Sequence, residues 1–300
     1  MQKAFFLFLT FIGFFSITEA QMLDARKSLF SDMPFFREEF IRKNQIKSFY
    51  GKVSTKKELD IIRTKGEFMH FEFYENGLLA KQYKVFSLAN GNKDTLLIMY
   101  LYDSNNRING VLKTDANGYY GNEYTFDADG NITKQTYCRY ENSNSSKVNF
   151  EMEKRYEISS ETYTYTQLTS TQVKKKYYNT YGNIYREDII NTDANGYLIS
   201  SDAVYIIGNN RFSYVYTYNE KGLLAKLTEE AVADVISVTE ITYKYDEAGN
   251  LLEENIFKNG KHTTVKQYLL DEKNMLVKAT LVKEVSTNLI TIFEYKYLFY

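Results

Sequence analysis

The chain of 300 residues has no tryptophan, one proline, one cysteine and two histidines. A single cysteine excludes a disulfide framework within the chain. Nothing in the sequence places an activating base beside Cys138, so we expect a buried or half-buried side chain there and not a nucleophile. The net charge of −1 gives no general attraction to nucleic acid or to an anionic membrane surface. We therefore predict no nucleic-acid partner.

Metal and cofactor motifs are also missing. His70 and His262 lie far apart, and neither belongs to a spacing that binds zinc. No glycine-rich phosphate loop joins a strand to a helix. The stretch from Asp127 to Asn131 contains two aspartates, but calcium requires six to eight oxygen ligands, and a turn explains the pattern better. We predict no metal and no cofactor.

Two pairs of adjacent acids, Glu229-Glu230 and Glu253-Glu254, have the residue types of a glycosidase. Adjacent side chains on a strand point to opposite faces, so neither pair can act as one catalytic site. The sequence therefore does not predict an enzyme.

Aromatic residues are abundant instead, with 28 tyrosines and 21 phenylalanines. Aromatic side chains fit the half-buried surface of a pleated sheet, and the scarcity of proline leaves long strands uninterrupted. The composition favours an all-β protein.

Residues 1–20 have the layout of a secretory signal peptide. Lys3 supplies the positive start, an apolar run extends from Ala4 to Ile17, and Thr18 and Ala20 occupy the cleavage positions. No cysteine follows the apolar run, so a lipid anchor is not predicted at this site. We expect an exported protein, either periplasmic or extracellular.

The next segment, residues 21–45, is the best place for a short helix. Ser31 or Asp32 can cap it, and Pro34 can occupy its first turn. Phe36 and Phe40 then share one face, and Asn44 is a plausible end. We expect this helix to cover one end or one edge of the domain that follows.

From residue 46 to residue 300 the sequence repeats a unit in which an aromatic pair precedes a turn. The turn has Asp or Asn at its start, Gly or Asn at its tight position, and Leu or Ile after it. The clearest units turn at Gly77, Asn106, Gly130, Gly182, Gly222, Gly249 and Asn274, and weaker ones turn at Gly118 and Gly196.

The spacing between turns predicts the fold. The period is about 26 residues with a second turn near its middle, so each unit is a β-hairpin. About 18 strands would form one long antiparallel meander. Open twisted sheets rarely exceed about ten strands, so this meander must roll into a barrel-like or spiral sheet. The tyrosines would line its concave face.

The units Tyr243-Lys-Tyr245-Asp246-Glu-Ala-Gly249-Asn250-Leu251 and Tyr216-Thr-Tyr218-Asn219-Glu-Lys-Gly222-Leu223 resemble YD repeats. These repeats occur in Rhs and teneurin-type shells and in secreted Bacteroidetes proteins. The resemblance covers residues 46–300 and implies a spiralling antiparallel sheet with surface contacts that include glycans. The repeats run to the last residue, which departs from the toxin members of the family.

These features favour a non-catalytic protein whose curved, tyrosine-rich sheet binds a protein or a glycan. The alternatives are a structural component of the cell envelope and an outer-membrane-type β-barrel. Charged residues on both faces of several strands argue against membrane insertion. The candidate partner-binding residues are Tyr124, Tyr214, Tyr216, Tyr218, Tyr243 and Tyr245.

One basic run, Lys174-Lys175-Lys176, interrupts the otherwise mixed charge pattern. Lysines on an edge strand discourage pairing with other chains. We interpret the run as a solvated or edge-protecting strand segment.

Overall fold

A computed structural model describes residues 22–24, 35–88, 91–115, 118–144, 146 and 149–300. The predicted signal peptide, residues 1–20, lies outside this part, and so do Ser31, Asp32 and Pro34. Within the described residues, no helix is long and apolar enough to cross a membrane.

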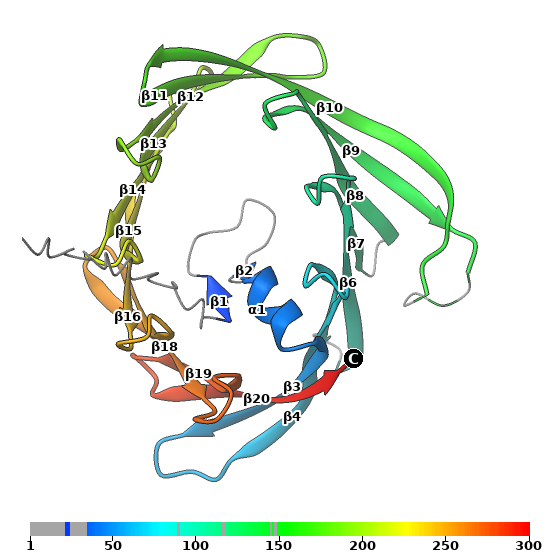
Figure 1. The fold of residues 1–300 in the computed structure, drawn as a ribbon, viewed down its shortest axis with the longest axis vertical. Coiled ribbons are helices and arrows are strands. Elements are labelled where there is room, and N and C mark those ends of the chain that lie inside the picture. Colours follow the sequence, from blue (N-terminus) through cyan, green and yellow to red (C-terminus); the bar gives the residue numbers. More distant parts are fainter. Residues whose placement is uncertain (1–21, 25–34, 89–90, 116–117, 145, 147–148) are drawn as a thin grey trace, which may run out of the picture.

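The chain forms a closed, all-antiparallel β-barrel of eighteen strands (Figure 1). Its strands are β3 (Ile46–Lys57), β4 (Arg63–Phe73), β5 (Leu79–Ser87), β6 (Lys93–Tyr102), β7 (Ile108–Asp115), β8 (Gly118–Phe126), β9 (Ile132–Asn142), β10 (Met152–Thr169), β11 (Gln172–Tyr178), β12 (Ile184–Thr192), β13 (Leu198–Tyr205), β14 (Arg211–Tyr218), β15 (Leu224–Val232), β16 (Ile236–Tyr245), β17 (Leu251–Lys258), β18 (Lys261–Leu270), β19 (Val277–Glu284) and β20 (Leu289–Phe299). The predicted all-β meander rolled into a barrel is confirmed.

The barrel closes where its last strand meets its first. β20 pairs with β3 along its whole length, with Tyr297 opposite Phe49 and Phe293 opposite Val53. A second contact at this seam is the hydrogen bond that the Tyr300 amide donates to the Gln45 carbonyl, at 2.9 Å. Closure leaves no unpaired edge strand in the barrel, which removes the hazard of edge-to-edge association.

The recurring turns have the chemistry that the sequence predicts. In the β6–β7 turn, the Asp103 amide donates to the Arg107 carbonyl (2.9 Å), and the Asn106 amide donates to the Asp103 carbonyl (3.0 Å). Asp103 Oδ1 accepts the amides of Asn105 and Arg107. Asn106 has φ of 60°, the left-handed conformation that Gly and Asn tolerate. Backbone bonds of the same pattern close the turns that begin at Asp127, Asn179, Asp193, Asn219 and Asp246.

One part of the predicted spacing is wrong. The sequence suggests that the turn at Gly182 continues the period set by the turn at Gly130. Connections of a meander alternate between its two ends, so the β8–β9 turn and the β11–β12 turn lie at opposite ends. The reason is the β10–β11 connection, which is a tight turn at Ser170 and Thr171 that lacks the Asp-Gly pattern.

The second tyrosine of the repeat ties one hairpin to the one before it. Tyr102, Tyr218 and Tyr245 each donate a hydroxyl hydrogen bond of 2.8 Å to a backbone carbonyl at the start of an earlier strand, at Leu79, Leu198 and Leu224 respectively. The Tyr297 hydroxyl does the same with Val277, at 2.6 Å. A phenylalanine would fill the space but could not make this bond, so the units with Phe73 and Phe126 at this position lack it.

The described residues that precede the barrel strands lie within the ring of strands in Figure 1. They form a two-stranded sheet, β1 (Leu23–Asp24) with β2 (Phe35–Phe36), and one helix, α1 (Glu38–Lys43). We call these three elements the plug. α1 lies against the β4–β5 turn at Gly77, and this position at one end of the barrel agrees with the expectation that the helix covers an end. An eighteen-stranded barrel has a lumen too wide for wall side chains alone to fill, and the plug occupies part of that space.

The predicted helix is shorter than expected. It begins after Arg37, which makes no side-chain cap, and Phe36 belongs to β2. The end of the helix is as predicted, because Asn44 is the C-cap and its Nδ2 donates to the Phe40 carbonyl at 2.9 Å. Phe36 and Phe40 still belong to one buried cluster. The pairing with β1 therefore replaces the first helical turn.

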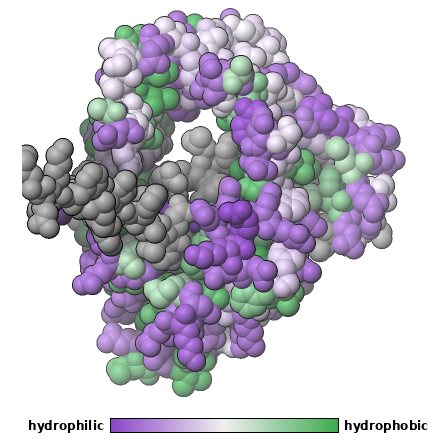
Figure 2. All heavy atoms as spheres, in the orientation of Figure 1, coloured by the Kyte–Doolittle hydropathy of each residue, from purple (hydrophilic) through white to green (hydrophobic). Residues whose placement is uncertain are grey.

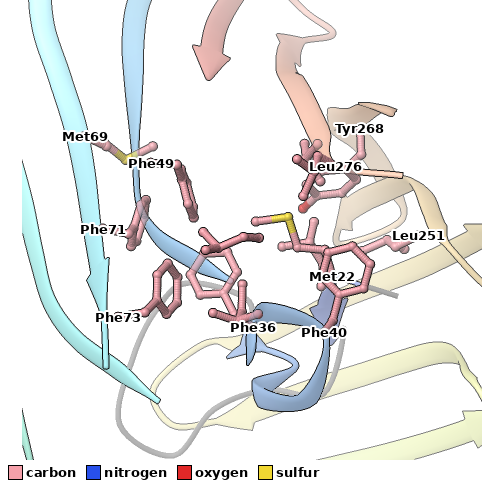
Figure 3. Close-up of a cluster of buried hydrophobic side chains, with 14 residues drawn as sticks. Met22, Phe36, Phe40, Phe49, Met69, Phe71, Phe73, Leu251, Tyr268 and Leu276 are labelled. Atoms are coloured by element: carbon pink, nitrogen blue, oxygen red, sulfur yellow. The ribbon is translucent and has the colours of Figure 1, made fainter. Parts of the chain in front are cut away.

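The plug packs on the barrel wall through phenylalanines (Figure 3). The Phe36 ring lies 5.2–5.3 Å from the rings of Phe49, Phe71 and Phe73, each in an edge-to-face arrangement. Met22, Leu23, Phe40 and Ile41 are the other members of the cluster that precede the barrel strands. Side chains alternate between the two faces of a strand, and residues directly opposite each other on paired strands share a face. Residues paired in register with Phe71 and Phe49 therefore also face the lumen.

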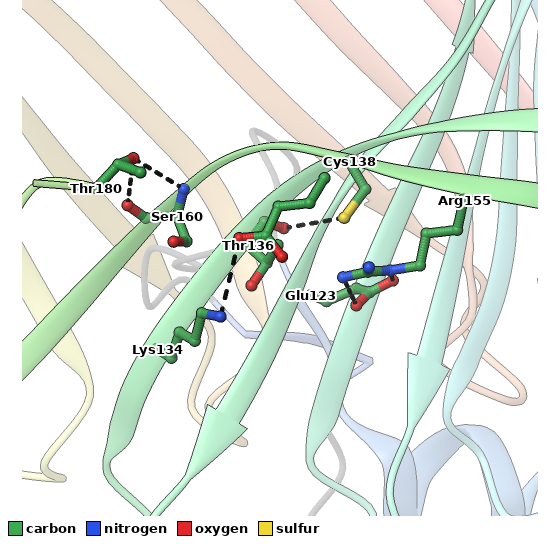
Figure 4. A network of polar contacts seen from close by, with 8 residues as sticks. Glu123, Lys134, Thr136, Cys138, Arg155, Ser160 and Thr180 are labelled. Carbon is green, nitrogen blue, oxygen red and sulfur yellow. Dashed lines mark hydrogen bonds and ion pairs between the residues drawn. The ribbon is translucent and has the colours of Figure 1, made fainter.

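The opposite face of the wall carries many charged side chains. Cross-strand ion pairs join Lys174 to Glu187 at 2.6 Å and Lys244 to Glu253 at 2.7 Å, and a further pair joins Lys226 to Glu240. Figure 4 shows part of the polar network on β8 to β10, where Arg155 holds Glu123 in two hydrogen bonds. Figure 2 shows that hydrophilic side chains are also abundant at the end of the barrel that faces the viewer.

A second apolar cluster interrupts this polar outer face on β5 to β9. It contains Tyr83, Leu97, Met99, Leu112, Cys138 and Tyr140. Phe150, from the β9–β10 connection, packs on Tyr119 and Tyr140 with ring centroids 4.9 and 6.3 Å apart. Cys138 is fully buried here, as predicted, and burial raises the pKa of its thiol.

A glycine pair tests the contact between the plug and the turns. Gly77 (φ 92°) lies against α1, so that a Cβ there would stand 2.0 Å from the Glu38 carbonyl oxygen. Gly182 has a similar φ of 77° but open space around it. We expect Gly182→Ala to lower the free energy of unfolding by about 1 kcal/mol through backbone strain. Gly77→Ala should cost roughly 2 kcal/mol more, because the helix must also shift.

The measurement is urea unfolding of both variants beside the wild type. Equal losses in the free energy of unfolding for the two alanine variants would show that the turn at Gly77 does not contact α1 closely.

Candidate functional site

The lumen holds a cavity of about 790 Å³ beside α1. This volume lies in the range of small-molecule sites, and Figure 2 shows the molecule hollowed between its wall and its central residues. Aromatic side chains from five strands line the cavity: Tyr102, Phe126, Tyr165, Tyr177, Tyr214 and Tyr216. Ile108, Ile132, Ile190 and Leu198 add aliphatic surface. The charged residues are Glu38, Arg107, Lys175, Arg186 and Asp188.

Lys175 of β11 lies among tyrosine rings on this wall. Its Nζ is 4.2 Å from the ring centroid of Tyr163, 4.5 Å from that of Tyr177 and 5.4 Å from that of Tyr165. Each ring face attracts a cation. Burial lowers the pKa of Lys175 to about 8, although the negative charges of Asp188 and Glu161 act to raise it.

Asp188, the acid opposite Lys175, already forms an ion pair with another residue. Asp188 of β12 is the register partner of Lys175, but its oxygens accept Arg186 Nε at 2.6 Å and Arg186 Nη2 at 2.7 Å. The Tyr177 hydroxyl also donates to Asp188, at 2.6 Å. The Asp188 side chain is only 4% exposed. The Asp188–Arg186 pair is therefore a buried, hydrogen-bonded ion pair.

Glu161 of β10 is the other acid near this cluster. Its Oε2 accepts hydroxyl hydrogen bonds from Tyr185 at 2.7 Å and from Tyr163 at 3.2 Å. These bonds and burial raise the pKa of both tyrosines. The carboxylate is satisfied by hydroxyls and not by the ammonium group of Lys175.

Arg107, at the turn end of the cavity, also has its own partner. Its guanidinium contacts Asp103 at 2.7 Å and lies over the Phe126 ring, 4.4 Å from the centroid. Among the residues that the structure describes, no carboxylate lies within 4 Å of Lys175. Lys175 is thus the cavity cation that has aromatic neighbours but no ion partner.

The structure does not bring the six predicted tyrosines to one site. Tyr214 and Tyr216 line the large cavity. Tyr218, Tyr243 and Tyr245 border a separate depression of about 630 Å³ near the β14–β15 and β16–β17 turns. Tyr124 packs against the cluster of Ile98, Tyr100, Ile108 and Val111 on the inner wall. Burial raises the pKa of Tyr216 and of Tyr124 to about 12.

The interpretation of the lysine run is wrong for edge protection and for Lys175. β11 is an interior strand of a closed barrel, so it protects no edge. Lys174 and Lys176 point outward to Glu187, whereas Lys175 points to the lumen. Because side chains alternate along a strand, Lys175 points to the opposite face from Lys174 and Lys176. The signal that sequence reasoning missed is the match between Tyr163-x-Tyr165 and Lys175-x-Tyr177, which places a lysine among tyrosines once β10 and β11 pair.

The other candidate residues lie apart from this cavity. His70 stacks on Tyr83 with centroids 5.3 Å apart, and burial lowers its pKa. His262 stacks on Phe257 at 4.6 Å. The described residues contain no group of three or more His, Cys, Asp or Glu side chains that could hold a metal ion. Asp127 holds its turn by accepting the Asn131 amide at 2.8 Å.

The adjacent acids point to opposite faces, as predicted. Glu253 accepts hydrogen bonds from Lys244 and Gln267 on the outer face, at 2.7 and 3.0 Å. Glu254 faces the lumen, where Lys266 Nζ donates to it at 3.1 Å and the Tyr268 hydroxyl at 2.5 Å. The two carboxylates therefore belong to separate networks.

Comparisons with known proteins place the chain in no family. No family model matches it, and no curated protein does. Among solved structures, it is similar to a porin-like protein from Bacteroides uniformis (TM-score 0.39, 11% identity, covering 84% of this chain and 98% of that one). A porin-like protein from Bacteroides vulgatus gives a TM-score of 0.35, with 11% identity over 82% and 97% of the two chains. A structure described as TcdB2-TccC3-TEV gives 0.25 and 11% identity over 75% of this chain and 15% of that one. These scores are too low to indicate function.

Proposed function

We propose that this protein is an exported, non-catalytic binding barrel that takes its ligand into the tyrosine-lined lumen. The observation that carries the proposal is the cavity of about 790 Å³ between α1 and the inner wall. Tyrosines offer large, rigid contact surfaces with a polar tip. Because these rings face inward, the partner must be a small molecule or a segment of a glycan or polypeptide narrow enough to enter the barrel.

The polar outer wall supports a barrel that faces water. A transmembrane barrel carries an apolar band on its outer face and polar residues inside. Here β15 to β17 carry Lys226, Glu240, Lys244 and Glu253 on the outer face, whereas tyrosines and leucines face the lumen. On these three strands the charged side chains support an outer face in water. The outer-membrane alternative would require lipid to solvate these ion pairs, which is costly.

A pair of serines tests the lumen as the binding site. Ser201 lines the cavity, whereas its neighbour Ser200 pairs with Val215 on the outer face of the same wall. The probe is N-phenyl-1-naphthylamine, an uncharged aromatic dye that fluoresces in apolar surroundings. We expect the wild type and Ser200→Trp to bind the dye alike. Ser201→Trp should weaken dye binding at least tenfold, because the indole fills the cavity.

Fluorescence titration of the three mature proteins gives the affinities, and circular dichroism confirms that each is folded. Equal binding by both tryptophan variants would place the dye outside the lumen and would contradict the proposal.

A further inference from the structure

We infer that the lumen cavity selects an anionic ligand with an apolar or aromatic body, and that Lys175 binds its negatively charged group. This inference rests on the proposed function, because it names the chemistry of a ligand in the same cavity. Three observations carry it: the position of Lys175 on the cavity wall, the occupation of its neighbouring acids, and the aromatic surface around it.

The first step concerns charge. A half-buried ammonium group is stable when an anion or a hydrogen-bond acceptor compensates for its lost hydration. Lys175 has the faces of Tyr163 and Tyr177 but no carboxylate within 4 Å among the described residues. A ligand carboxylate, sulfonate or phosphate would supply the missing partner.

The second step concerns the acids that might compete. Asp188 is held by Arg186 and by the Tyr177 hydroxyl, and Glu161 is held by two tyrosine hydroxyls. A ligand anion therefore need not displace an existing ion pair to reach Lys175. Glu38 also lines the cavity from the side of α1, where burial raises the pKa of its carboxyl group.

The third step concerns the rest of the ligand. The rings of Tyr165 and Tyr177 lie next to Lys175. Further along the cavity wall come Ile190 of β12 and Leu198 of β13, and then Tyr214 and Tyr216 of β14. Aromatic rings and aliphatic groups favour a ligand with an apolar portion, and they provide few polar contacts for a bare inorganic ion. The combination of one cation and an apolar wall fits an amphipathic monoanion.

A pair of dyes that differ by one charged group tests this inference. Anilinonaphthalene sulfonate has the same aromatic body as N-phenyl-1-naphthylamine and adds a sulfonate. We expect Lys175→Met to weaken binding of the sulfonate dye about tenfold and to leave binding of the neutral dye unchanged. Lys176→Met is the matched control, because Lys176 lies on the outer face and faces Glu187. It should change neither affinity.

The outcomes separate the two proposals. Equal sulfonate affinity in the wild type and Lys175→Met, with normal binding of the neutral dye, would overturn the role of Lys175 and leave the lumen site standing. Failure of both dyes to bind the wild type would overturn both. Binding of the neutral dye also shows that Lys175→Met is folded, and Lys175→Gln gives a second variant of the same test.

The pH dependence provides an independent readout. Because burial lowers the pKa of Lys175 to about 8, the affinity for the sulfonate dye should fall between pH 7 and pH 9. The other groups around Lys175 are Glu161, Tyr163 and Tyr165 from β10, Tyr177 from β11, and Arg186 and Asp188 from β12. Glu38 of α1 lines the same cavity. The pKa values of these three tyrosines are raised, so their hydroxyls stay protonated over this interval. In Lys175→Met, the affinity for the sulfonate dye should no longer fall between pH 7 and pH 9. A fall that persists in this variant would contradict the role of Lys175 as the group that binds the anion.

Discussion

Asp188→Ala is expected to lower the free energy of unfolding by about 3–5 kcal/mol, the largest loss for any single ion pair in the barrel. The substitution leaves the Arg186 guanidinium, only 26% exposed, without its counter-ion. It also removes the acceptor of the Tyr177 hydroxyl. The melting temperature should fall by roughly 10 °C, as measured by circular dichroism.

Asp202→Ala is the matched control. Asp202 is on the next strand and accepts the Ser213 hydroxyl at 2.7 Å on the outer face, where it is exposed. Its loss should cost less than about 0.5 kcal/mol. Asp188→Ala should also free Arg186 as a second cation on the cavity wall, so binding of the sulfonate dye should tighten. Similar small losses for both alanines would mean that the buried pair does not form.

Phe36→Ala is expected to detach the plug from the wall. Phe36 makes edge contacts with three phenylalanines at the centre of the cluster in Figure 3. Truncating a buried phenylalanine typically costs about 3–5 kcal/mol. If the barrel wall holds, the loss appears as release of the plug. Limited proteolysis should then cut before residue 45 far faster than in the wild type, and the neutral dye should gain a second binding site.

Tyr181→Ala controls for the loss of an aromatic ring. Tyr181 is 87% exposed at the β11–β12 turn, so its truncation should change neither stability nor proteolysis. Wild-type resistance to proteolysis in Phe36→Ala would show that the plug is held by contacts other than this ring.

The sequence predicts the barrel wall because the wall is built from local rules. Asp103 and Asn106 close a turn with their own neighbours, and strand alternation places Tyr243 and Tyr245 on one face. The number of strands then follows from the count of turns. A signal of this kind depends on residues a few positions apart, so it is visible without any knowledge of the tertiary structure.

The plug and the cavity depend instead on long-range contacts. Whether Phe36 continues a helix or joins a strand depends on Leu23, thirteen positions away, and on the wall of β3 and β4. The role of Lys175 depends on the register between β10 and β11 and on the competition between Lys175 and Arg186 for Asp188. Neither register nor competition can be read from composition or spacing.

The seam between β3 and β20 also sets the order of assembly. The Tyr297 hydroxyl reaches Met22 Sδ at 3.6 Å, a contact between residues 275 positions apart in the chain. Contacts of such separation form late, because the intervening chain must be ordered first. The plug is joined directly to β3 and packs on β3 and β4, the first wall strands to be synthesised. The remaining hairpins must therefore form around a plug that is already folded, and the pairing of β20 with β3 closes the barrel last. A plug released before this step would have to re-enter through an open end, so we expect the early hairpin to act as the template on which the ring is completed.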